Sequence, residues 1–126
     1  YTKRQCALRK QLLERYRGMG LRPKQTASVL AAFSAAERAE AKRVMESLLR
    51  EGELISVGPG LCLHREAYER VLSAVRSHFA AHDALTLAQL RDALGTSRDY
   101  ALVILETLDR RGVTRREGDL RRPGRL

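Results

Sequence analysis

The stretch that decides the fold is residues 85–122, LTLAQLRDALGTSRDYALVILETLDRRGVTRREGDLRR. Two of its segments carry apolar residues at helical spacing, and two shorter ones are typical of strands. Gly95 separates the helical segments, and Gly118-Asp119 forms a tight turn between the strands. The expected elements are a helix at 87–94, a helix from a Thr96 or Ser97 cap to about Arg111, and strands at 113–117 and 120–122.

The residues just before this stretch complete a known motif. Glu66–His82 has apolar residues at helical spacing, and Leu85-Thr86 is a short extended piece. The order is therefore helix, short strand, helix, helix and hairpin. This order predicts a winged helix-turn-helix, in which the hairpin is the wing.

The chain contains this motif twice. Sliding the sequence by 60 residues without a gap aligns Gly52 with Gly112 and Gly58 with Gly118, together with many alanines and leucines. The expected elements of the first copy are helices at 5–17, 24–33 and 35–51 and a hairpin of 54–57 with 61–64. Ser34 and Glu37 suggest a capping box on the third helix. We predict a mainly α protein with small β hairpins (α+β), built of two tandem winged-helix modules at 1–64 and 65–126.

Composition excludes several classes of protein. The 126 residues are 44 % hydrophobic and 31 % charged, with 5 % aromatics and no Trp. No stretch approaches the roughly 18 apolar residues of a membrane span, so we expect no membrane association. Cys6 and Cys62 are too few for a disulfide scaffold, are expected to be buried small hydrophobes, and favour a reducing, cytoplasmic location. Because residue 1 is Tyr, we expect a fragment of a longer protein.

Positive charge gathers at both ends of the chain. The net charge is +9, with a pI of about 10.4. Residues 1–24 carry eight Lys or Arg and one acid, and residues 110–126 carry seven Arg and two acids, whereas the residues between them are net acidic. These ends are either solvated tails or a footprint for phosphates, since a basic protein of this size usually binds a polyanion.

The expected recognition helix of the second copy is a poor surface for a DNA major groove. Its outward positions include Asp99, Glu106 and Asp109 together with two aliphatic residues, and these carboxylates would repel phosphates. Positive groups are instead expected at its start, where Arg98 lies beside the free N–H groups of Thr96–Asp99, and on the wing. This arrangement favours a protruding RNA hairpin. The wing of the first copy has no basic residue, so that copy is expected to be a spacer.

The second copy resembles a known family. Gly95-Thr-Ser-Arg-Asp-Tyr-Ala101 and Gly112-Val-Thr-Arg-Arg-Glu-Gly-Asp119 are similar to the last winged helix of the bacterial selenocysteine-specific elongation factor, SelB. The first copy is similar to the preceding winged helix, so the chain resembles the third and fourth winged helices of that family. One departure is Asp99, where the family usually has Lys.

The resemblance implies a fragment of a translation elongation factor that binds the selenocysteine insertion (SECIS) hairpin of messenger RNA during protein biosynthesis at UGA codons. Its other partners, the ribosome and selenocysteinyl-tRNA, would be bound through the full-length protein. GTP and Mg²⁺ are expected only in N-terminal domains outside this sequence. This chain is expected to be a monomer without cofactor. The alternative is a tandem winged-helix DNA-binding transcriptional regulator, for which the recognition helix should be basic.

Eight residues are the expected RNA contacts, all in the second copy. Tyr100 would either stack on a base or pack within its own module. We expect no enzyme activity, because no phosphate loop, nucleophile elbow or zinc-protease motif is present. We also expect no metal, although His78 and His82 lie one turn apart. The expected contacts are Thr96, Ser97, Arg98, Tyr100, Arg115, Arg116, Arg121 and Arg122.

Overall fold

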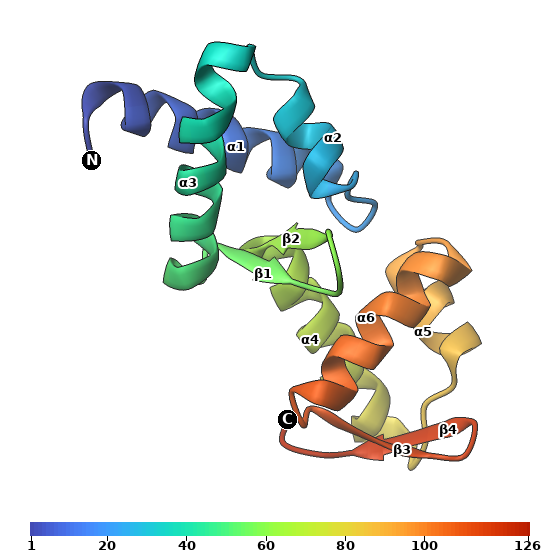
Figure 1. Ribbon diagram of the computed structural model, residues 1–126. Helices are drawn as coiled ribbons and strands as arrows, with labels where there is room; N and C mark the ends of the chain where they lie inside the picture. Colours follow the sequence, from blue (N-terminus) through green and yellow to red (C-terminus); the bar gives the residue numbers. More distant parts are fainter. The chain divides into compact units, whose positions relative to one another are not determined.

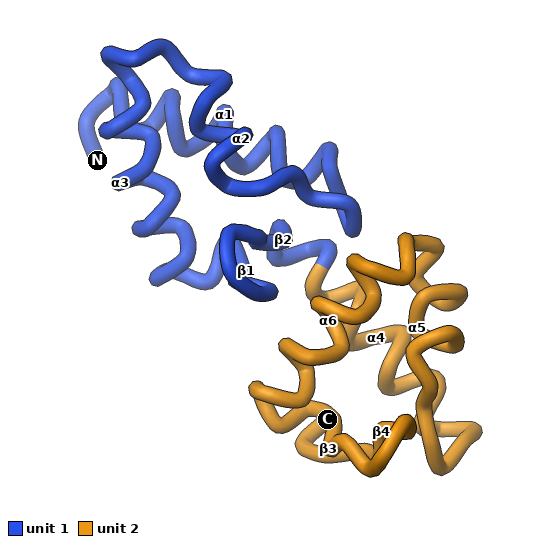
Figure 2. The backbone as a smooth tube through the Cα atoms, turned by 45° about the vertical axis from the view of Figure 1, so that its right-hand side comes forward, with its two compact units in different colours: residues 1–67 blue, residues 68–126 orange.

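The computed structural model describes all 126 residues as two compact units, Tyr1–Ala67 and Tyr68–Leu126 (Figure 2). Both have the same order of elements (Figure 1). The first unit contains helices α1 (Lys3–Met19), α2 (Thr26–Ala31) and α3 (Ala35–Glu51) and strands β1 (Leu54–Ser56) and β2 (Cys62–His64). Helix α4 (Arg65–Ala81) crosses into the second unit, which continues with α5 (Leu87–Leu94), α6 (Arg98–Arg110), β3 (Thr114–Glu117) and β4 (Leu120–Pro123).

The first unit is organised around the packing of α1 against α3. Leu8, Leu12 and Tyr16 repeat at helical spacing along α1, and all three are buried against α3 and the hairpin. Strands β1 and β2 pair antiparallel, with Ile55 opposite Leu63. Both ends of α3 are capped, by Ser34 at its start and by Gly52 in the left-handed conformation at its end.

The second unit buries one face of α6 against α5 and the wing. Ala101, Ile104, Leu105 and Leu108 are at most 1 % exposed. The start of α5 is fixed by a capping box, in which the Thr86 and Gln89 side chains each accept the other residue's backbone N–H. Every helix of the chain is too short or too polar to cross a membrane.

The wing of the second unit is a short, tight hairpin. Glu117 lies opposite Leu120, so Gly118 and Asp119 alone form the turn. Gly118 has a φ of +62°, which glycine adopts without strain. Leu85 extends the sheet, because its N–H and C=O both bond to the backbone of Arg121 at 2.9 Å. The wing is therefore attached to the segment that precedes α5.

The structure confirms the predicted mainly α fold with two small hairpins, and corrects it in detail. The repeat is not free of gaps, because the caps Ser34 and Ser97 lie 63 residues apart whereas Gly52 and Gly112 lie 60 apart. The capping box expected at Ser34 is incomplete, since Glu37 accepts from the Ser34 hydroxyl and not from its backbone N–H. Cys6 is exposed, contrary to expectation, and only Cys62 is buried.

Candidate nucleic-acid interface

The start of α6 presents Arg98 to solvent. Ser97 is the N-cap, and its hydroxyl accepts the backbone N–H of Tyr100 at 3.2 Å. Arg98 is the first residue of the helix and is exposed. From the sequence we expected a free backbone N–H at Thr96. In the structure this N–H donates to the Arg91 carbonyl at 3.3 Å, and Thr96 is buried. Ser97 therefore shapes this end of the helix, and Arg98 carries its charge.

The register of the wing sorts its four arginines into two pairs. Arg115 lies opposite Arg122, and Arg116 lies opposite Arg121. Residues directly opposite each other share a face of the sheet, and consecutive residues point to opposite faces. One face of the wing thus carries Arg115 and Arg122, and the other carries Arg116 and Arg121.

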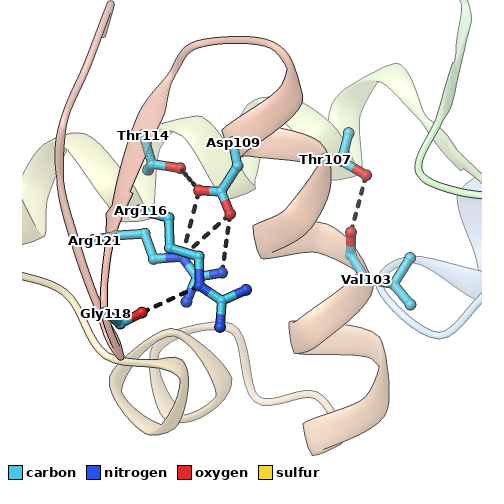
Figure 3. Close-up of polar contacts among 7 residues, drawn as sticks. All are labelled: Val103, Thr107, Asp109, Thr114, Arg116, Gly118 and Arg121. Atoms are coloured by element: carbon cyan, nitrogen blue, oxygen red, sulfur yellow. Dashed lines mark hydrogen bonds and ion pairs between the residues drawn. The ribbon is translucent and has the colours of Figure 1, made fainter.

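Arg121 is not an outward-facing residue, contrary to the prediction from sequence. Its side chain is only 4 % exposed, and its Nη2 lies 2.9 Å from Oδ2 of Asp109 (Figure 3). The Thr114 hydroxyl donates to Oδ1 of the same carboxylate at 2.6 Å. The predicted outward position of Asp109 is also wrong, because its carboxylate faces the wing and not the solvent. The pair connects β4 to the last turn of α6, since a buried guanidinium requires a paired, hydrogen-bonded anion.

The other three wing arginines differ in how much of their guanidinium is free. Arg122 donates to the Asp83 carbonyl at 3.3 Å and pairs with Glu117 at 3.4 Å. Arg116 is exposed, and its Nε donates to the Gly118 carbonyl at 3.1 Å, so the side chain curls over the turn with both Nη groups available (Figure 3). Arg115 is exposed, and its guanidinium has no hydrogen bond or ion pair within the chain.

A groove of about 410 Å³ brings arginines from three elements together in the second unit. Arg98 from α6 and Arg116 from β3 line it, and both belong to the contacts expected from the sequence. Arg91 from α5 lines it too, and sequence reasoning missed this residue. The available signal was helical spacing, because Arg91 follows Leu87 by four residues and Leu87 lines the same groove.

The matching groove of the first unit has different chemistry. It consists of two hollows along α2, α3 and the first hairpin that share Thr26, Leu30 and Lys42. The lining is largely apolar but also includes Glu46, and Lys42 has no ion pair. Arg38 also borders this groove, but its guanidinium is bonded to carbonyls at the end of α2 and of Phe33. The apolar lining is provided chiefly by Ala27, Leu30, Ala39, Met45, Leu49 and Leu61. Only the second unit therefore concentrates free arginine in this position.

The outer surface of α6 is acidic in part. Asp99 and Glu106 are exposed, and Leu102 is half-buried beside the groove. Tyr100 is half-buried as well. A helix with exposed carboxylates in its first and third turns would repel the phosphates that flank a DNA groove. The geometry places the free positive charge at the helix start and on the wing.

None of the three histidines lines the groove. His64 is buried, its Nδ1 accepts the Glu66 N–H at 3.0 Å, and burial together with Arg17 lowers its pKa. Arg17 pairs with Glu66 at 2.9 Å and lowers the pKa of that carboxyl. His78 and His82 stack at 4.6 Å between ring centroids, and His78 contacts the Ala84 carbonyl. No three metal-binding side chains form a cluster.

Comparison with known proteins finds similarity to one elongation factor. A sequence model described as "Elongation factor SelB, winged helix" matches residues 77–122. The selenocysteine-specific elongation factor of Desulfomicrobium baculatum is 28 % identical over 117 residues, which are 93 % of this chain and 18 % of that protein. The chain thus spans about a fifth of the length of this relative.

Two solved structures have the same fold. One is the mRNA-binding domain of elongation factor SelB from E. coli in complex with SECIS RNA, with a TM-score of 0.77 and 21 % identity over 98 % of this chain and 99 % of that one. The other is the bacterial selenocysteine-specific elongation factor EF-Sec, with a TM-score of 0.73 and 20 % identity over 94 % of this chain and 18 % of that one.

The fold and the arginine-lined groove define a tandem winged-helix protein. The matched residues include α5, α6 and the wing, the elements that build the groove. In this part of the chain the sequence is similar to a winged helix of elongation factor SelB, and the whole chain has the fold of the SelB mRNA-binding domain. The matched winged helix is the third of SelB, whereas the sequence resemblance assigned this unit to the fourth.

Proposed function

We propose that this chain binds the SECIS hairpin of messenger RNA through its second unit. The observation that carries the proposal is the concentration of unneutralised arginine around α6 and the wing of that unit. The domain of similar fold from E. coli was solved with SECIS RNA, which supports the same class of ligand here.

Each arginine has a distinct role in this proposal. Arg98 and Arg116 contact backbone phosphates, because both line the groove and a guanidinium binds phosphate with two parallel hydrogen bonds. Arg115 contacts a base of the loop, because its guanidinium is entirely free to form a forked contact. Arg121 acts indirectly by holding the wing against α6. Ser97 and Thr96 shape the helix start.

The acidic surface of α6 favours RNA over the alternative of a DNA-binding regulator. Asp99 and Glu106 would oppose insertion of α6 into a major groove. A hairpin loop that meets only the helix start and the wing avoids Glu106 in the third turn, and Asp99 in the first turn is the one carboxylate of this helix that it would approach. The first unit has no comparable basic groove, so we propose that it separates the RNA-binding unit from the rest of a longer factor.

The longer factor would be a selenocysteine-specific elongation factor that works on the ribosome in the cytoplasm. Domains outside this sequence would bind GTP with Mg²⁺ and selenocysteinyl-tRNA. Binding of the messenger RNA hairpin by the present region would tether that complex near the UGA codon. This region needs no cofactor for that role and works as a monomer.

A binding competition tests the proposal. The chain is titrated into a fluorescently labelled RNA stem-loop that follows a selenocysteine UGA codon, and into a DNA duplex with the same number of phosphates. We expect preferential binding of the stem-loop, with a slope of log K against log salt of roughly −2 to −4 for three to five neutralised phosphates. Equal binding of both nucleic acids at each salt concentration would reject hairpin recognition.

A further inference from the structure

Arg91 is the arginine that α5 contributes to the groove. It lies on α5, its side chain is 39 % exposed, and its Nε contacts Oδ1 of Asp92 at 3.0 Å. Asp92 is 72 % exposed and is the next residue in the chain, so this ion pair is solvated and weak. Arg91 can therefore exchange Asp92 for a stronger anion at little cost.

The groove itself has the composition of a phosphate site. The cations on its lining that have no buried partner are Arg91, Arg98 and Arg116, and the carboxylate on its lining belongs to Asp119 in the exposed turn. Arg121 also lines it, but its charge is neutralised by Asp109. Arg98 and Arg116 have no ion pair and Arg91 has only its solvated pair with Asp92, so the groove carries an excess of positive charge.

Three features fix the backbone turns or the side chain from which these arginines reach the groove. The capping box at Thr86 fixes the first turn of α5, Ser97 fixes that of α6, and the bond from Arg116 to Gly118 fixes the wing arginine over the turn. Three arginines from three separate elements thus line one groove. Such prior positioning reduces the side-chain entropy lost when a ligand binds.

We infer that Arg91 completes, with Arg98 and Arg116, a three-arginine clamp for one backbone phosphate of the bound RNA. The half-buried Leu87 and Leu102 on the groove lining provide an apolar surface for the sugar beside that phosphate. The inference rests on the proposed function and adds to it a contact from α5. The RNA is thereby held from α5, α6 and the wing together.

Two substitutions of Arg91 test the clamp in the full chain. R91A should weaken binding of the labelled stem-loop about five- to tenfold and flatten the salt slope by about one unit, because one phosphate contact is lost. R91K should keep most of the slope but recover only part of the affinity, since Lys retains the charge without the fork. Circular dichroism establishes that each variant is folded.

The matched control is R76A, which removes an exposed arginine of α4 in the same unit that does not line the groove. It should change the affinity less than twofold. Equal affinity and equal salt slope for R91A and R76A, with the original chain still preferring the stem-loop, would overturn the clamp and leave the proposed function intact. Loss of that preference in the original chain would instead reject the proposed function.

Discussion

Replacing Asp109 by Ala should destabilise the second unit strongly. The substitution removes the anion that lies 2.9 Å from Nη2 of Arg121, whose side chain is only 4 % exposed. Removing one partner of a buried ion pair costs about 3–5 kcal/mol, because the other charge is left without compensation. The Thr114 hydroxyl also loses its acceptor. Since Asp109 is 20 % exposed, water can enter the vacated space, and we expect the lower value of about 3 kcal/mol.

The reverse substitution should cost less. In R121M the Asp109 carboxylate keeps the Thr114 hydroxyl and its access to water, so we expect a loss of about 1–2 kcal/mol. The double variant D109A/R121M should be more stable than D109A alone, because no uncompensated charge remains. This order, in which loss of the acid costs more than loss of the base, follows from the different exposure of the two side chains.

Urea denaturation followed by far-UV circular dichroism measures these differences. A loss of about 3 kcal/mol corresponds to a fall in Tm of roughly 12–24 °C for a unit of this size. E106A is the control, since Glu106 is exposed on the same helix and its loss should change stability by at most about 0.5 kcal/mol. If D109A unfolds at the same urea concentration as E106A, the ion pair does not hold the wing and the reasoning fails.

Three further substitutions test separate parts of the account. Ser97→Ala should cost about 1 kcal/mol of stability, because α6 loses the hydroxyl that accepts the Tyr100 N–H, and an unchanged midpoint in urea would argue against that cap. Asp99→Lys should tighten binding of the stem-loop and steepen its salt slope by about one unit, and weaker binding would place the phosphates elsewhere. Burial lowers the pKa of His64, so below pH 6.5 the unfolded chain binds a proton that the folded chain resists, and stability should fall as the pH falls. His64→Asn should reduce that loss in denaturation curves measured across this pH range, and an identical pH dependence would assign the effect to other groups.

Local chemistry made most of the fold predictable. Gly95 and Ser97 define the boundary between α5 and α6, and Gly118-Asp119 defines the wing turn, so patterns within a few residues were sufficient. The predicted constant offset of 60 residues between the two copies was wrong in detail, because α3 has 17 residues and α6 has 13. A helix can lose a turn without changing the glycine that ends it.

The candidate site was harder to predict, because its charges are sorted by tertiary packing. Alternation along the wing separates Arg115 from Arg116 but does not show which face meets α6. The partner of Arg121 is 12 residues away, on a helix whose orientation the sequence does not give. Arg91 enters the site for the same reason, since α5 must pack against α6 before the groove exists.

The central claim is that the free arginines of the second unit bind the RNA hairpin. The most direct test measures stem-loop affinity for two variants that lose the same charge, R98A/R115A/R116A in the second unit and K3A/K10A/K24A in the first. All six side chains are exposed. At about 1 kcal/mol for each arginine, we expect roughly a hundredfold loss for the first variant and a small loss for the second. Equal losses, or a larger loss for the lysine variant, would contradict the claim.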